Sequence, residues 1–211
     1  RDDELFAVVD ELERLARARG DLGEAALMLA QRSQLLIGQL RHHEARAAMD
    51  EALALVEPLP ASTVKTRVWL LQAWLLMLDR DWADSMAWAE RALALAQSLG
   101  DEQLVGRGRN TRSVAMLFVD YPAACAEQLA LLDEYRQCGE LDRVAGVLGS
   151  LGSGAGELMH LADAEGWLRE LVDLSRAHEL DASWDYGAAW LALVRVRRGG
   201  WDEAGQLATE V

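Results

Sequence analysis

Apolar residues recur at steps of three and four along the chain, which is the spacing of one face of an α-helix. A first helix, ending near Gly20, is predicted by the stripe Leu5, Val8, Val9, Leu12 and Leu15. The later stripes predict helices in pairs, at about 24–40 with 43–56, 63–79 with 82–98, 102–119 with 122–137, 141–160 with 162–178, and 182–198 with 201–211. The turns between them contain Pro58, Pro60, Gly100 and Gly139, and Ser62 is a predicted N-cap.

Small residues return about every forty positions on the second helix of each pair, at Ala45, Ser85, Ala124, Ala164 and Ala204. A second small series runs on the first helices, at Ser33, Ala73, Ser113, Ser153 (or Gly152) and Ala192. Two helices that cross closely leave no room for a large side chain, so these series predict the crossing points of helical hairpins. Bulky residues expected to pack at the hairpin turns precede the first series by three positions, at His42, Trp82, Tyr121, Leu161 and Trp201.

A fixed period of this length indicates a helical-repeat protein. We predict an all-α, right-handed superhelix of antiparallel helical hairpins, with about eleven helices and a period of about forty residues. The small-residue pairing is that of the tetratricopeptide repeat, although the period exceeds its usual value of about thirty-four. No shift in composition marks a boundary, so residues 1–211 are predicted to form one repeat domain, excised from a longer protein.

The composition supports this fold and narrows the partners. Of the 211 residues, 51% are hydrophobic, and the formal net charge is −14, which argues against direct contact with nucleic acid. No apolar run is long enough to cross a membrane. Cys125 and Cys138 fall on one predicted helix, about 20 Å apart along its axis, and cannot bridge to each other there. Two unpaired thiols suit a reducing compartment, so we expect a cytoplasmic protein.

Several stretches resemble the tetratricopeptide-like superhelix of bacterial MalT-like proteins, the sensor region of large ATP-dependent LuxR-family transcriptional regulators. The stretches that carry the resemblance are Asp81-Trp82-Ala83-Asp84-Ser85, Ala92-Leu93-Ala94-Leu95, Leu99-Gly100-Asp101 and Arg198-Gly199-Gly200-Trp201-Asp202-Glu203-Ala204. The resemblance implies an upstream nucleotide-binding module and a downstream helix-turn-helix in the complete protein. Neither lies in these residues, which contain no Gly-x-x-x-x-Gly-Lys-Ser/Thr sequence.

No motif in the chain points to catalysis, a cofactor or a metal. The glycines between Gly146 and Gly156 have no lysine nearby to make a phosphate loop, and they predict a helix that packs very closely, kinks or frays. His42-His43-Glu44 lacks the spacing of a metal site. We therefore predict no catalytic, cofactor-binding or metal-binding residues.

The first helix of each hairpin lines the concave side in this architecture, so binding residues are expected there. Trp69, Trp74, Trp184 and Trp190 lie on first helices, and some of them must belong to the core. By register, the candidates for a concave binding groove are Arg67, Trp74, Arg107 and Asn110, with Tyr186 and Trp190 behind them. An aromatic and arginine groove suits a peptide or an extended acidic ligand, whereas the alternative is that Trp74 and Trp190 only pack between repeats.

Three functions follow from this reading. The first is a non-catalytic module that binds a protein, a peptide or a small effector on its concave face and serves as the sensor of a LuxR-family regulator. The second is a stand-alone tetratricopeptide adaptor in a multiprotein complex. The third, more distant, is an all-helical enzyme. The incomplete last hairpin also leaves an uncapped apolar end that favours self-association.

Overall fold

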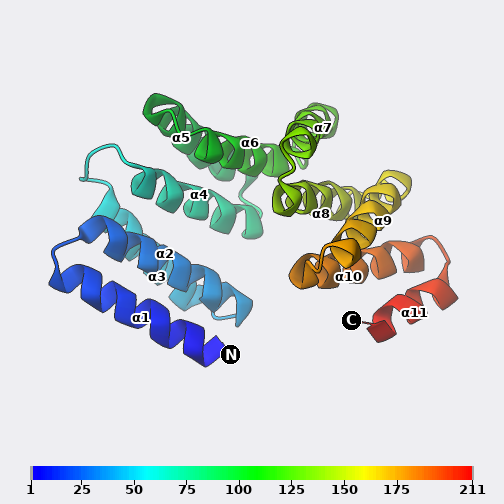
Figure 1. Cartoon of the computed structure of the whole chain (residues 1–211), viewed down its shortest axis with the longest axis horizontal. Coiled ribbons are helices and arrows are strands. Elements are labelled where there is room, and N and C mark those ends of the chain that lie inside the picture. Colours follow the sequence, from blue (N-terminus) through cyan, green and yellow to red (C-terminus); the bar gives the residue numbers. More distant parts are fainter. Residues whose placement is uncertain (1, 211) are drawn as a thin grey trace. The chain divides into compact units, whose positions relative to one another are not determined.

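A computed structural model describes residues 2–210, and over that range the chain is entirely helical apart from short turns (Figure 1). The eleven helices of the described residues are α1 (Asp2–Ala18), α2 (Leu22–Gly38), α3 (His42–Val56), α4 (Thr63–Leu78), α5 (Trp82–Leu99), α6 (Glu102–Met116), α7 (Tyr121–Cys138), α8 (Leu141–Glu157), α9 (Leu161–Ala177), α10 (Asp181–Arg197) and α11 (Trp201–Glu210). The prediction of an all-α array of helical hairpins is confirmed.

Short polar side chains start several of these helices. The Oγ of Ser62 accepts the backbone N–H of Lys65 at 3.2 Å, which confirms the predicted N-cap. Aspartates do the same at the starts of α2, α5 and α7, at Asp21, Asp81 and Asp120. Gly100 ends α5 with φ of 67°, a left-handed conformation that glycine adopts without strain. Local capping chemistry therefore sets several of the helix boundaries that the sequence predicts.

The helices gather into two compact units, which divide between Ala115 and Met116 at the end of α6. In the first unit, a core formed by α1 to α4 includes Leu27, Met49 and Val68, and a further cluster joins Trp69 and Leu70 of α4 to Leu104 of α6. In the second unit, one core runs through α7 to α10 and is centred on large buried leucines, among them Leu148 and Leu168.

The small-residue series lie at buried positions, as predicted for helix crossings, except for Ala192, which is half-buried. Ser85 is fully buried, and its Oγ donates to the backbone carbonyl of Ala73 on the preceding helix at 2.8 Å. Ser33 and Ala45 are likewise buried. On α8 the buried member is Gly152, whereas Ser153 is half-buried. The side chain of Leu168 leaves no space for a Cβ at Gly152, so the second of the two alternatives occupies the crossing.

The prediction for the bulky turn residues is confirmed in part. The Tyr121 ring stacks on His160, which lies at the next hairpin turn, with ring centres 4.1 Å apart. The prediction is wrong for Trp201, whose side chain is 68% exposed, and for His42, which is also exposed. No turn within residues 2–210 follows that of Trp201, so this ring lacks the neighbour that Tyr121 has.

The glycine-rich segment forms a continuous helix. α8 runs without interruption from Leu141 to Glu157, so the predicted fraying is wrong, whereas the predicted close packing is confirmed. A Cβ at Gly154 would lie 2.7 Å from Leu117 Cδ1, and one at Gly156 would lie 3.1 Å from Val194 Cγ2. The helix tolerates most of these glycines because neighbouring apolar side chains fill the space that the missing side chain leaves at Gly149, Gly152, Gly154 and Gly156.

Lys65 holds the turn between α3 and α4. The residue is only 8% exposed, and its Nζ donates to the backbone carbonyls of Glu57 and Leu59 at 2.6 and 3.0 Å. The same Nζ lies 5.2 Å from the centre of the Trp69 ring. Removing this group would leave two carbonyls at the end of α3 without their donor.

Replacing Lys65 with methionine is therefore expected to lower the free energy of unfolding by about 2 kcal/mol, because charge-assisted hydrogen bonds are lost from a buried site. Urea titration followed by circular dichroism measures the change. Arg14→Met removes a charge from an exposed surface position and should change stability by less than about 0.5 kcal/mol. An equal loss in both variants would assign the effect to net charge instead of the carbonyl contacts.

Candidate functional site

The first unit contains a hollow of about 280 Å³ between the first helices of three successive hairpins, α2, α4 and α6. Four of the predicted groove residues line it together, namely Arg67, Trp74, Arg107 and Asn110. The lining that sequence reasoning missed is Leu27, Gln31, Gln34, Leu70, Leu71 and Thr111.

The ten lining residues occupy only four positions of the forty-residue repeat. This spacing of forty is a sequence signal from which the six missed residues could have been predicted. Each position recurs on successive first helices, giving the sets Leu27, Arg67 and Arg107; Gln31, Leu71 and Thr111; Gln34 and Trp74; and Leu70 and Asn110. Because first helices are related by one repeat, residues forty apart present equivalent surfaces. The hollow is thus a property of the repeat register.

The chemistry of the hollow is cationic, amide-bearing and aromatic. Arg67 and Trp74 are half-buried and Arg107 is exposed, so their side chains reach solvent. The Oδ1 atom of Asn110 is buried and accepts no hydrogen bond from any described residue. No acidic side chain lines the hollow, although the chain has 35 aspartates and glutamates.

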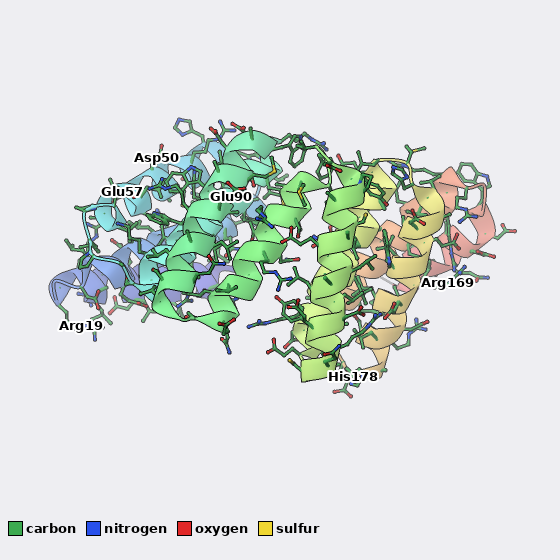
Figure 2. The ribbon with its side chains drawn as sticks, turned by 90° about the horizontal axis from the view of Figure 1, so that it is seen from above. Arg19, Asp50, Glu57, Glu90, Arg169 and His178 are labelled. Carbon is green, nitrogen blue, oxygen red and sulfur yellow. The ribbon has the colours of Figure 1, made fainter. Side chains whose placement is uncertain are left out.

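Most acidic side chains face outward instead. Asp50, Glu57 and Glu90, which are labelled in Figure 2, are all exposed. Several pair with arginines of neighbouring hairpins. Arg17 of α1 contacts Glu51 of α3 at 2.6 Å, and Arg91 of α5 contacts Glu57 at 3.0 Å. Such exposed pairs contribute little stability, but they neutralise the arginines that form them.

Arg67 and Arg107 differ from the other arginines in the contacts that their side chains make. Within residues 2–210 they are the only two arginines whose side chains make no hydrogen bond, ion pair or ring contact with the chain. Both lie in the same hollow. A pair of unneutralised guanidinium groups there creates a local positive potential in an otherwise acidic protein.

The first-helix tryptophans divide between core and surface. Trp69 is 9% exposed and packs between Trp88, with ring centres 6.1 Å apart, and the Arg91 guanidinium, 4.5 Å from its ring centre. It is therefore a core residue, whereas Trp74 lines the hollow. Trp184 is half-buried, and the Arg176 guanidinium lies 5.9 Å from its ring centre.

The two remaining predicted groove residues, Tyr186 and Trp190, lie on α10 in the second unit. Their ring centres are 6.5 Å apart, and Tyr186 is 47% exposed. By helix register Tyr186 corresponds to Arg107 of α6, because each lies five residues after the first residue of its helix. In the same way Trp190 corresponds to Thr111, nine residues after the first residue of each helix. The residue of α8 that corresponds to Arg107 is Gly146. The second unit therefore repeats the surface position of the arginines without a cation.

The histidine, cysteine and carboxylate side chains outside the hollow do not gather into a metal site within residues 2–210. Among the described residues, no cluster of three or more His, Cys, Asp or Glu side chains is placed to hold a metal ion. Cys125 and Cys138 are free thiols on α7, and burial raises the pKa of the Cys125 thiol. Within residues 2–210 no helix combines the length and the apolar character needed to cross a bilayer.

No family model and no curated protein match the chain. Among solved structures, the chain is similar to the crystal structure of BtubC (BKLC) from P. vanneervenii. The two superpose with a TM-score of 0.65 at 18% sequence identity, over 100% of this chain and 89% of that one. At this identity the likeness shows the fold alone, an all-α array of repeated helices.

Proposed function

We propose that the chain is a non-catalytic binding module and that the hollow of its first unit receives a peptide segment of a partner protein. The observation that carries this proposal is the joint lining of one hollow by Trp74, Arg67 and Arg107, which come from two successive first helices. Exposed aromatic and arginine side chains are the residue types that dominate protein-binding energetics. No histidine, cysteine or carboxylate lines the hollow to supply acid–base or nucleophilic chemistry.

The proposal is tested by panning a random peptide library against the chain and measuring the binders with the Trp74→Ala variant. We expect peptides whose affinity falls about 10- to 100-fold in this variant, because an indole at the centre of an interface contributes most of its contact area. Trp74 is half-buried at the surface of the hollow, so circular dichroism should show the variant folded.

Trp201→Ala is the matched control, since it removes an exposed indole that does not line the hollow. Its affinity for the same peptides should equal that of the unmodified chain. If the library yields no binder that depends on Trp74, the hollow is not a peptide site.

We further propose that in a longer protein this module is the sensor part of a MalT-like, LuxR-family regulator. The support is the set of turn motifs around Asp81 and Gly200, together with the helical-repeat fold. A stand-alone adaptor would use the same hollow in the same way. The gene sequence on either side decides between them, because the regulator requires a nucleotide-binding loop upstream and a helix-turn-helix downstream.

A further inference from the structure

We infer that the hollow selects an extended peptide segment with two carboxylates, one for Arg67 and one for Arg107. This inference rests on the proposed function, since it names the chemistry of the segment that the hollow would bind. It starts from the charge of the site. The lining contains two arginines and no acidic residue, in a chain whose net charge is −14.

The free state of these arginines indicates that their partners come from outside the chain. Arg17, Arg91 and Arg136 each contact a glutamate of a neighbouring hairpin. Arg67 and Arg107 have no such partner within residues 2–210, although acidic residues are abundant. A planar guanidinium binds a carboxylate through two parallel hydrogen bonds, the arrangement that an acidic side chain of a ligand would complete.

The repeat register indicates how far apart the two carboxylates lie. Arg67 and Arg107 are forty residues apart, at equivalent positions of α4 and α6. Residues of both helices belong to one apolar cluster, with Leu70 of α4 and Leu104 of α6 among its buried members, and both helices line the hollow. The axes of neighbouring helices in a packed array lie about 8–10 Å apart. An extended chain advances about 3.3 Å per residue, so two or three residues cover most of this spacing. The expected motif is acidic-x-acidic or acidic-x-x-acidic.

The neutral lining suits the rest of such a segment. Asn110 lines the hollow with an amide side chain, which can hydrogen-bond the backbone of the bound segment. Gln31 and Gln34 add amide groups, and the Trp74 ring offers an apolar surface for a side chain between the acidic residues. The exposed acidic residues outside the hollow, such as Asp50 and Glu90, disfavour a long polyanion and so favour a short segment.

The test uses the Trp74-dependent peptides from the library, the residue 1–211 chain and its Arg67→Gln and Arg107→Gln variants. We expect the peptides to contain two acidic residues separated by one or two positions. Replacing either acidic residue with its amide should weaken binding about 10-fold, and each arginine variant should do the same, because a charge-assisted pair is lost. In each arginine variant, replacing one of the two acidic peptide residues with its amide should no longer weaken binding, whereas replacing the other should still do so.

Arg14→Gln is the matched control, because it removes the same charge from an exposed arginine that pairs with Glu11 on α1. It should leave the affinity unchanged, whereas an equal loss would show that only overall charge matters and would overturn the inference. Peptides that depend on Trp74 but are neutral, or that need a single acidic residue, would also overturn it while the proposed function stands. Binding that requires phosphoserine and ignores glutamate would overturn the carboxylate assignment.

Discussion

The Ser85→Leu substitution is expected to lower the free energy of unfolding by about 3 kcal/mol or more, whereas Ser85→Ala should lower it by only about 1 kcal/mol. Ser85 is fully buried where α5 crosses α4, and its Oγ donates to the Ala73 carbonyl at 2.8 Å. Alanine removes this hydrogen bond but keeps the close approach of the helices. Leucine removes the bond and must also force the two helices apart.

Urea titration of the Ser85→Leu and Ser85→Ala variants, followed by circular dichroism, measures both effects. For a chain of this length each kcal/mol corresponds to a shift in melting temperature of about 2–4 °C. The difference between the two variants isolates the steric part of the effect, since both lose the same hydrogen bond. Equal losses would show that the crossing does not need a small residue, and the same conclusion would then apply to Ala45 and Ala164.

Alanine substitutions at Gly152 and Gly146 are expected to change stability in opposite directions, although both residues lie on α8. A Cβ at Gly152 would lie 2.5 Å from Cγ of Leu168. Leu168 is fully buried and cannot move without disturbing the core of the second unit. Gly152→Ala should therefore cost about 1–3 kcal/mol, even after the gain in helix propensity. A Cβ at Gly146 would meet no atom within 4 Å. Gly146→Ala should stabilise by about 0.5–1 kcal/mol.

The two alanine variants are each other's controls, because the chemical change and the helix are the same. The measured quantity is the difference between their free energies of unfolding, expected at about 1.5–4 kcal/mol. Stabilisation by both substitutions would mean that Leu168 adjusts freely and that Gly152 is not a packing requirement. Amide exchange along α8 gives an independent reading, since close packing predicts slow exchange at residues near Gly152.

Much of the fold could be predicted because its signals are local and repeated. Ser62 begins α4 and Gly100 ends α5 through contacts within one turn of the chain, so the role of each follows from its residue type. The predictions for Trp201 and for fraying of α8 were wrong for a common reason. Both depend on which side chains of other helices pack against the residue, and spacing along the chain does not contain that information.

The candidate site shows the same division. The repeat register places Arg67, Arg107, Trp74 and Asn110 on equivalent surfaces of first helices, and residue spacing alone is enough for that because every repeat has the same geometry. The tertiary structure decided that Trp69 is core while Trp74 lines the hollow, and that Arg67 and Arg107 stay unpaired while arginines such as Arg17 and Arg91 contact glutamates. Ion pairs and burial depend on distances between side chains of different helices, which only the packed structure defines.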